Sequence, residues 1–163
     1  MRGRVLILGF LGGLACFVAA LWYFQTYAFY EDLPRQDIRL GGQDYPVIEW
    51  QGTYATSSPL KLRACFTVSP ETLAAMSAVE TDAAAAEPLV APSWFDCFDA
   101  GAIAADLKAG MATAFALGPT GADGIDGWMA LYPDGRGYLW RQLHPRFANQ
   151  EPLFALALAA PGA

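Results

Sequence analysis

Basic residues are scarce in this chain beyond its first four positions. Residues 31–163 contain all 16 acidic residues but only eight of the 10 lysines and arginines, which gives this part a formal charge of −8. Nucleic-acid binding depends on clustered lysine and arginine side chains that displace counterions from phosphates. The composition therefore excludes nucleic acid as a partner.

The chain also lacks the motifs of common catalytic and cofactor sites. It has neither C-x-x-C nor C-x-x-C-H, and the loop GPTGADG (118–124) lacks the lysine and the hydroxyl of a phosphate-binding loop. Zinc needs about four ligands, whereas Cys65, Cys97 and the single histidine, His144, supply three. A copper site built from these three is chemically conceivable, but their spacing does not favour it. We expect no metal, no cofactor and no catalytic residue, and an enzyme would have to use His144 or the acidic surface.

A long uncharged segment separates Arg4 from Glu31. As a helix its 26 residues would extend ~39 Å, against a bilayer hydrocarbon core of ~30 Å. Arg2 and Arg4 precede it, and the positive-inside rule then places the N-terminus in the cytoplasm and the following domain outside. Residues 1–30 are thus predicted to form a cytoplasmic tip and a single transmembrane anchor.

Aromatic side chains gather at the distal end of this anchor, where amphipathic rings prefer the headgroup layer. We assign an interfacial belt to Trp22, Tyr23, Tyr27 and Tyr30. Two alternatives remain: a signal peptide cleaved after Ala20, and a lipoprotein attached at Cys16. Apolar residues continue past both positions, which favours an uncleaved anchor.

Small residues recur along one face of the predicted anchor helix. Gly9, Gly13, Cys16 and Ala20 share this face at helical spacing, and Gly9 and Gly13 form a G-x-x-x-G pair. Such a face lets two helices approach closely, which would suit docking on a membrane complex or on a second copy. The alternative is that glycine is simply common in membrane helices.

The rest of the chain predicts one small domain. A polar connector (31–36) precedes an α+β domain (37–148) with a mainly antiparallel sheet and two short helices, and a C-terminal tail follows (149–163). Ser69 and Asp99 are suited to cap the two helices. The predicted elements are a hairpin over 37–48, a strand over 60–68, helices over 70–78 and 100–109, and strands over 111–118, 125–132 and 138–144.

Cys65 and Cys97 are an even pair in the part of the chain predicted to lie outside, where disulfides form. We predict that they are bonded to each other. Closing a loop of this length stabilises a fold by roughly 3.5 to 4 kcal/mol in the chain-entropy model.

Three segments, LRACF (62–66), APSWFDCFDA (91–100) and LYPDGRGYLW (131–140), follow an anchor that runs into QTYAFYE. Together they resemble an uncharacterised family of small single-pass membrane proteins from alphaproteobacteria. The resemblance covers most of the chain and implies a Gram-negative inner membrane with a periplasmic domain. It implies no activity.

These observations favour a non-catalytic, membrane-anchored interaction protein, an accessory or assembly subunit of an inner-membrane complex. Its expected partners are membrane lipid and a membrane-protein complex or a second copy, through the transmembrane helix. The alternatives are a periplasmic ligand-binding or sensory module, which needs a pocket with converging polar groups, and an enzyme of unknown type.

Overall fold

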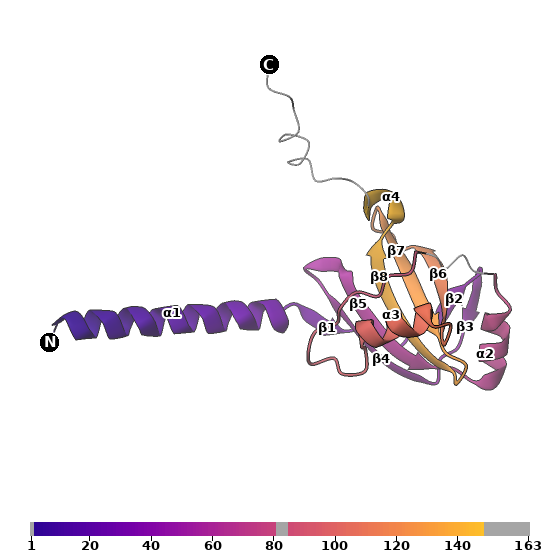
Figure 1. Ribbon diagram of the computed structural model, residues 1–163, viewed down its shortest axis with the longest axis horizontal. Helices are drawn as coiled ribbons and strands as arrows, with labels where there is room; N and C mark the ends of the chain where they lie inside the picture. Colours follow the sequence, from indigo (N-terminus) through magenta and orange to yellow (C-terminus); the bar gives the residue numbers. More distant parts are fainter. Residues whose placement is uncertain (1, 81–84, 149–163) are drawn as a thin grey trace, which may run out of the picture.

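The N-terminal helix leads almost directly into a six-stranded antiparallel sheet in this computed structural model, which describes residues 2–80 and 85–148 (Figure 1). The sheet order is β1-β4-β5-β8-β7-β6, and β2 and β3 form a separate two-stranded ribbon. The elements are α1 (Arg2–Thr26), β1 (Tyr30–Asp32), β2 (Ile38–Leu40), β3 (Gln43–Tyr45), β4 (Glu49–Ala55), β5 (Ser58–Thr67), α2 (Pro70–Ser77), α3 (Ala100–Lys108), β6 (Thr113–Pro119), β7 (Ile125–Leu131), β8 (Arg136–Leu143) and α4 (Pro145–Ala148).

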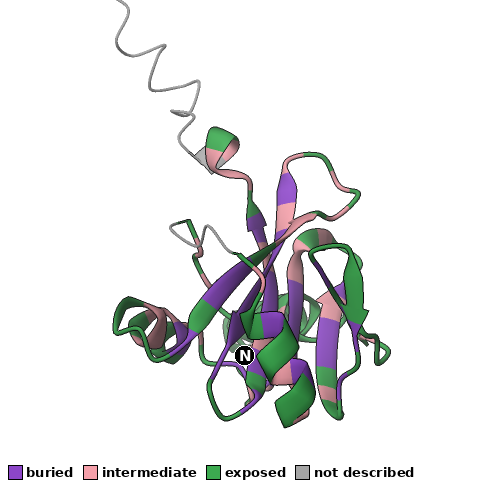
Figure 2. Ribbon diagram, turned by 90° about the vertical axis from the view of Figure 1, so that its right-hand side faces the viewer, coloured by how far each residue is buried: buried purple, intermediate pink, exposed green. Residues whose placement is uncertain are grey.

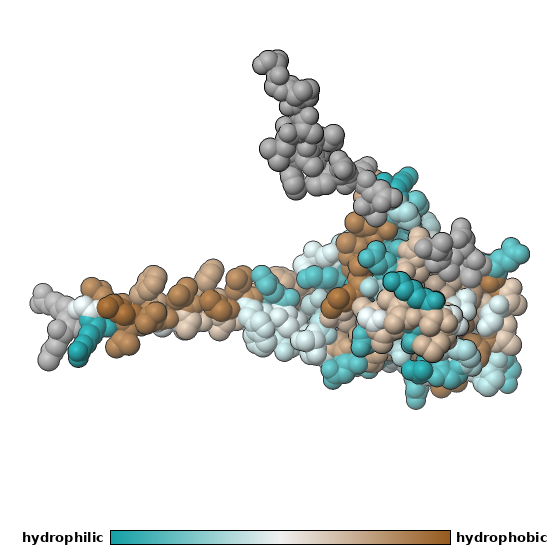
Figure 3. All heavy atoms as spheres, viewed as in Figure 1, coloured by the Kyte–Doolittle hydropathy of each residue, from teal (hydrophilic) through white to brown (hydrophobic). Residues whose placement is uncertain are grey.

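Helix α1 is the one apolar helix in the described residues that is long enough to cross a membrane. Its residues 3–26 have a mean hydropathy of 2.4 in their most apolar window, and none of that window is buried against the domain. Figure 3 shows most of it as a hydrophobic rod that projects from a domain of mixed hydropathy. Both a membrane anchor and a signal sequence have this length and composition.

The large sheet is antiparallel and short helices help to cover both of its faces. This confirms the predicted α+β class. One face packs on the β2–β3 ribbon and α2, through residues such as Ile38, Tyr45 and Met76. The opposite face packs on α3 and the segment before it, through Phe95, Phe98 and Ile103. Buried residues accordingly follow the strands through the middle of the molecule (Figure 2).

Both predicted helix caps are present. The Ser69 hydroxyl accepts a hydrogen bond from the Thr72 amide at 3.2 Å, and Pro70 is the first residue of α2. The Asp99 carboxylate accepts from the Ala102 amide at 3.0 Å at the start of α3. Each side-chain oxygen satisfies an amide that has no partner inside its helix, which is why both helices begin where the sequence predicts.

The polar segment 31–36, expected to be a connector, is partly a strand. Glu31 and Asp32 belong to β1, which pairs with β4, and the Leu33 amide donates to the Gly52 carbonyl at 2.9 Å. Backbone pairing with a distant strand is what gives these polar residues a regular structure. The sequence reading also missed β4 as a strand separate from the 37–48 hairpin. The predicted tail, 149–163, lies outside the described residues.

Gly137 is required by the packing of the sheet. It is the cross-strand partner of Phe66, whose buried ring lies over it. A methyl group on Gly137 would come within 2.8 Å of Phe66 Cε1 and closer still to other ring atoms. We expect Gly137→Ala to lower the free energy of unfolding by about 1–3 kcal/mol, because the ring has to move within a packed core. Chemical denaturation measures this change.

Gly101→Ala is the matched control. Gly101 lies inside α3, and the nearest atom to an added methyl group is Asp99 Oδ1, at 3.4 Å. Alanine should leave the stability unchanged or raise it by up to ~1 kcal/mol, since glycine is a poor helix former. Equal effects of the two substitutions would contradict the role of the Phe66 ring.

Candidate functional site

Cys65 and Cys97, predicted to pair, are joined in a disulfide with a Cα–Cα distance of 6.3 Å. Cys65 lies in β5, in the middle of the sheet, and Cys97 lies two residues before the Asp99 cap of α3. The bond therefore fastens the segment before α3 to the sheet. It also rules out the copper alternative, because neither sulfur is available as a thiolate ligand.

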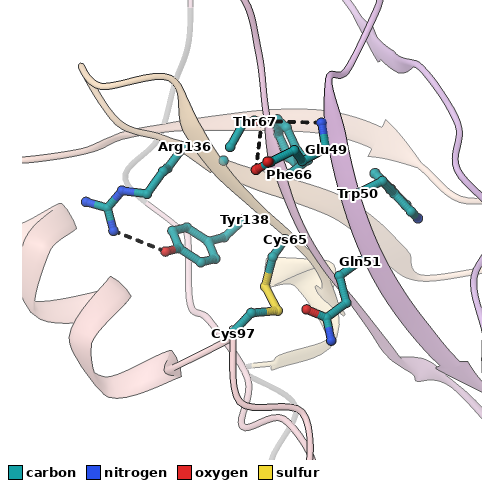
Figure 4. A pocket seen from close by; sticks show the side chains of 10 residues that line it. Glu49, Trp50, Gln51, Cys65, Phe66, Thr67, Cys97, Arg136 and Tyr138 are labelled. Atoms are coloured by element: carbon teal, nitrogen blue, oxygen red, sulfur yellow. Dashed lines mark hydrogen bonds between the residues drawn. A yellow bond between two sulfur atoms is a disulfide. The ribbon is translucent and has the colours of Figure 1, made fainter.

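A hollow of about 380 Å³ opens beside the disulfide (Figure 4). Several of its polar side chains pair with one another or with neighbours, whereas the Gln51 amide group forms no hydrogen bond with any described residue. The Arg136 guanidinium donates to Asp134 at 2.7 Å and to the Tyr138 hydroxyl at 3.4 Å, and the Thr67 hydroxyl donates to Glu49 at 3.4 Å. A hydroxyl meets a carboxylate in this hollow only at Thr67 and Glu49, in a long and exposed hydrogen bond.

Residues 85–98, here called the strap, cross the aromatic face of the sheet without joining any strand or helix. Gln142 of β8, a buried residue, holds the first part of the strap. Its amide group donates to the Ala85 carbonyl at 2.6 Å, and its oxygen accepts from the Glu87 amide at 2.8 Å and from Trp140 Nε1 at 3.0 Å. All three bonds are made in or beside the core, where an unpaired amide is costly.

Arg63 of β5 holds the middle of the strap. Polar and apolar residues alternate along β5, a pattern that favours a solvent-facing arginine, yet Arg63 is only 3% exposed. Its guanidinium donates to the carbonyls of Leu89 and Val90, at 2.7 and 3.2 Å, and to two carbonyls of its own strand. Burial lowers the pKa of Arg63 to about 10, so the group stays charged at neutral pH. Four carbonyl acceptors take the place of a carboxylate partner.

The end of the strap contacts the end of α1. Trp94 Nε1 donates at 2.8 Å to the carbonyl of Thr26, the last residue of the helix. The Trp94 ring stacks on Tyr27 with centroids 6.3 Å apart and meets Tyr30 edge-on at 5.4 Å. Carbonyls at a helix C-terminus lack partners within the helix, so Trp94 caps α1 from the domain.

The predicted belt residues lie in two different settings. Trp22 and Tyr23 are exposed on α1, whereas Tyr27 and Tyr30 lie beyond its end, because the helix stops at Thr26 and not at residue 30. Tyr30 is the first residue of β1, and burial raises the pKa of its hydroxyl. Part of the belt is thus built into the domain.

The predicted docking face remains uncovered. Gly9, Gly13, Cys16 and Ala20 are all exposed on α1, and a methyl group added at either glycine would meet nothing within 4 Å. Cys16 is a free thiol. A neighbouring helix could therefore approach this face without hindrance from the domain.

His144 does not lie near the disulfide in the β5–β8 pairing, where Tyr138 is the partner of Cys65. His144 Nε2 lies 3.9 Å from Asp126 Oδ2, and the histidine is partly exposed. Within 2–80 and 85–148, no group of three or more histidine, cysteine, aspartate or glutamate side chains could hold a metal ion.

Sequence reasoning missed the contacts of Arg63, Gln142 and Trp94. Arg63 and Gln142 occupy positions where a strand pattern predicts a solvent-facing polar side chain, and both are buried under the strap. The one available signal was the unusual length of the segment between the two helices, since long loops without regular structure tend to have a role.

A family model described as "Family of unknown function (DUF6446)" matches residues 40–150, more than half of the chain, and the chain belongs to this family. No curated protein and no solved structure matches it.

The disulfide should make a large contribution to stability. Replacing both Cys65 and Cys97 with alanine should lower the free energy of unfolding by roughly 3.5 to 4 kcal/mol, since the bond closes a loop with a sequence separation of 32. Thermal unfolding of the two proteins measures the difference. Adding a reductant should lower the melting temperature of the native protein and leave the variant unchanged. Equal stability of the two proteins would refute the structural role.

Proposed function

Because membership of a family of unknown function assigns no activity, we propose from the geometry that this protein is a non-catalytic, membrane-anchored interaction protein. It would be an accessory or assembly subunit of an inner-membrane complex. Its N-terminus lies in the cytoplasm and its domain lies in the periplasm.

The junction between α1 and the sheet is the observation that carries this proposal. Three residues separate Thr26, the end of the helix, from Tyr30, the start of β1, and Trp94 contacts both sides of this gap. Thr26 and Tyr30 follow Ala20, so these contacts fix the distal end of α1 to the domain. The exposed apolar residues before them supply the argument for an uncleaved helix.

Cleavage after Ala20 would also leave an unfavourable N-terminus. Leu21, Trp22, Tyr23 and Phe24 are each between 46% and 58% exposed, and no part of the described domain covers them. Such a cluster is stable in a bilayer or its headgroup layer and costly in water. This supports an uncleaved anchor with its distal end at the membrane surface.

Charge and the disulfide support the orientation. Arg2 and Arg4 lie at the N-terminal end of α1, and Glu31 and Asp32 follow its C-terminal end, where the domain begins. The positive-inside rule then puts the domain in the periplasm. The Cys65–Cys97 bond fits that compartment, because cytoplasmic thiols are kept reduced.

The docking face on α1 points to the kind of partner. With no hydrophobic driving force between helices in lipid, association depends on close packing, which Gly9 and Gly13 allow. A transmembrane helix of a larger complex, or a second copy, would fit this face. Purification in mild detergent followed by mass spectrometry tests the proposal, and a protein that runs only as a free monomer contradicts it.

We expect Gly9→Leu to weaken this association at least several-fold, because a leucine side chain separates the two backbones. Ala15→Leu is the matched control: it introduces the same leucine in place of a small residue of the same helix, about 120° around the axis from Gly9. Co-purification of each variant with its partner measures the effect. If the two variants lose the partner equally, the docking face is wrongly assigned.

The mass of the purified chain tests the anchor itself. We expect the mass of the intact sequence, close to 17.5 kDa, in the membrane fraction. A chain that begins at Leu21 would instead identify a cleaved signal peptide, and a lipid-modified chain that begins at Cys16 would identify a lipoprotein. Either result would overturn the anchored topology.

A further inference from the structure

A second hollow, of about 290 Å³, lies on the face of the sheet opposite the strap. One cross-strand row forms part of its lining: Gly118 of β6 pairs with Gly127 of β7, and Gly127 pairs with Arg141 of β8. Two adjacent glycines present backbone alone, so this row carries no side chain until Arg141. Glycine inside a strand is typical of places where a ligand or another backbone approaches closely.

Arg141 is the unusual member of this row. Every other arginine of the domain has a hydrogen bond or an ion pair; these are Arg35, Arg39, Arg63, Arg136 and Arg146. The Arg141 side chain is half-buried. Within residues 31–80 and 85–148 it has neither a hydrogen-bond partner nor an ion-pair partner. Burial lowers the pKa of Arg141, which reflects the cost of removing its charge from water. An anion in the hollow would offset that cost.

The remaining lining indicates which anion would fit. Leu62, Leu117 and Leu139 offer an apolar wall next to the guanidinium, so an apolar body can accompany the anionic group. Asp37 and Arg39 also line the hollow; Arg39 is paired with Asp44 at 3.6 Å, whereas Asp37 forms no ion pair with Arg141. The negative charge of Asp37 opposes a multiply charged ligand more than a singly charged one. The planar fork of a guanidinium matches a carboxylate.

We propose that this hollow binds a small monocarboxylate with an apolar body, held by its carboxylate on Arg141. The body lies against the leucine side chains, and the bare backbone at Gly127 gives it room. β2 and β6, which border the hollow, lie toward the end of the domain remote from α1 (Figure 1), so the ligand comes from the aqueous space and not from the bilayer. Neither the anchor nor its docking face is needed for this site.

Hexanoate is the probe, and calorimetric titration of the full chain in nanodiscs of uncharged lipid measures its binding. We expect saturable binding that Arg141→Gln weakens at least tenfold, because a charge-assisted, two-pronged hydrogen bond is lost. Arg146→Gln is the matched control, since it removes the same charge from an exposed arginine that pairs with Asp123 elsewhere. This control should leave the affinity unchanged.

Two further variants make the test independent of Arg141. A methyl group on Gly127 would meet Leu117 Cβ and Thr120 Cγ2 at 3.4 Å, an ordinary contact, so Gly127→Ala should fold and weaken hexanoate binding by filling the floor. Asp37→Asn should tighten binding, because a nearby negative charge is removed. Thermal unfolding of each variant checks that it is folded.

The site is refuted if hexanoate shows no saturable binding to the native protein. It is also refuted if Arg141→Gln binds as tightly as Arg146→Gln, or if 1-hexanol binds as tightly as hexanoate. Should Arg141→Gln fail to fold, the other two variants decide. The site is supported if Gly127→Ala weakens hexanoate binding and Asp37→Asn strengthens it, and it is refuted if either variant binds like the native protein.

Discussion

The Cys65–Cys97 bond fastens the strap, whose own backbone hydrogen bonds are limited to turns at Pro92–Phe95 and Phe95–Phe98. The face of the sheet beneath it carries large aromatic side chains, including Trp128 and Trp140, which must be shielded from water. Helix α3 has nine residues and covers only part of that face. The strap covers another part, although its backbone adopts no regular structure and belongs to no ladder. Its position therefore depends on side chains of the sheet and on one covalent bond.

The attachments of the strap form a continuous path from the sheet to the N-terminal helix. Gln142 and Arg63 bind its backbone, the disulfide fixes Cys97, and Trp94 reaches the last carbonyl of α1. The same segment therefore completes the core and caps the helix. A loss of order in the strap would affect both, so the disulfide matters to more than the stability of the domain.

Local signals in the sequence predicted the local parts of this structure. Ser69 and Asp99 cap helices through bonds to residues three positions away, so their roles follow from a short stretch of chain. Gly41 and Gly42 adopt positive φ values of 59° and 83° in the predicted 37–48 hairpin. The pairing of Cys65 with Cys97 followed from the count of cysteines outside the N-terminal helix.

The parts that depend on distant segments could not be predicted in the same way. β1 is a strand only because β4 lies beside it, and its own three residues show no clear pattern. Arg63 alternates correctly with its neighbours, but alternation does not reveal that the other face of β5 is covered as well. The row of Gly118, Gly127 and Arg141 depends on a register shift between Ala116 and Gly118. The sequence of one strand alone does not predict such a shift.

The short passage from α1 to β1 has a mechanical consequence. Only three residues connect the helix to the sheet, and Trp94 holds the last carbonyl of the helix, so a rotation of the helix is expected to carry the sheet with it. Transmembrane helices tilt by about 20° on average, and a domain of this size is roughly 30 Å across. A change of that order in the tilt of α1 would swing the far end of the domain sideways by roughly 10 Å. In the anchored form proposed above, a tilt of α1 inside the bilayer would thus move the domain outside it without any change in the fold.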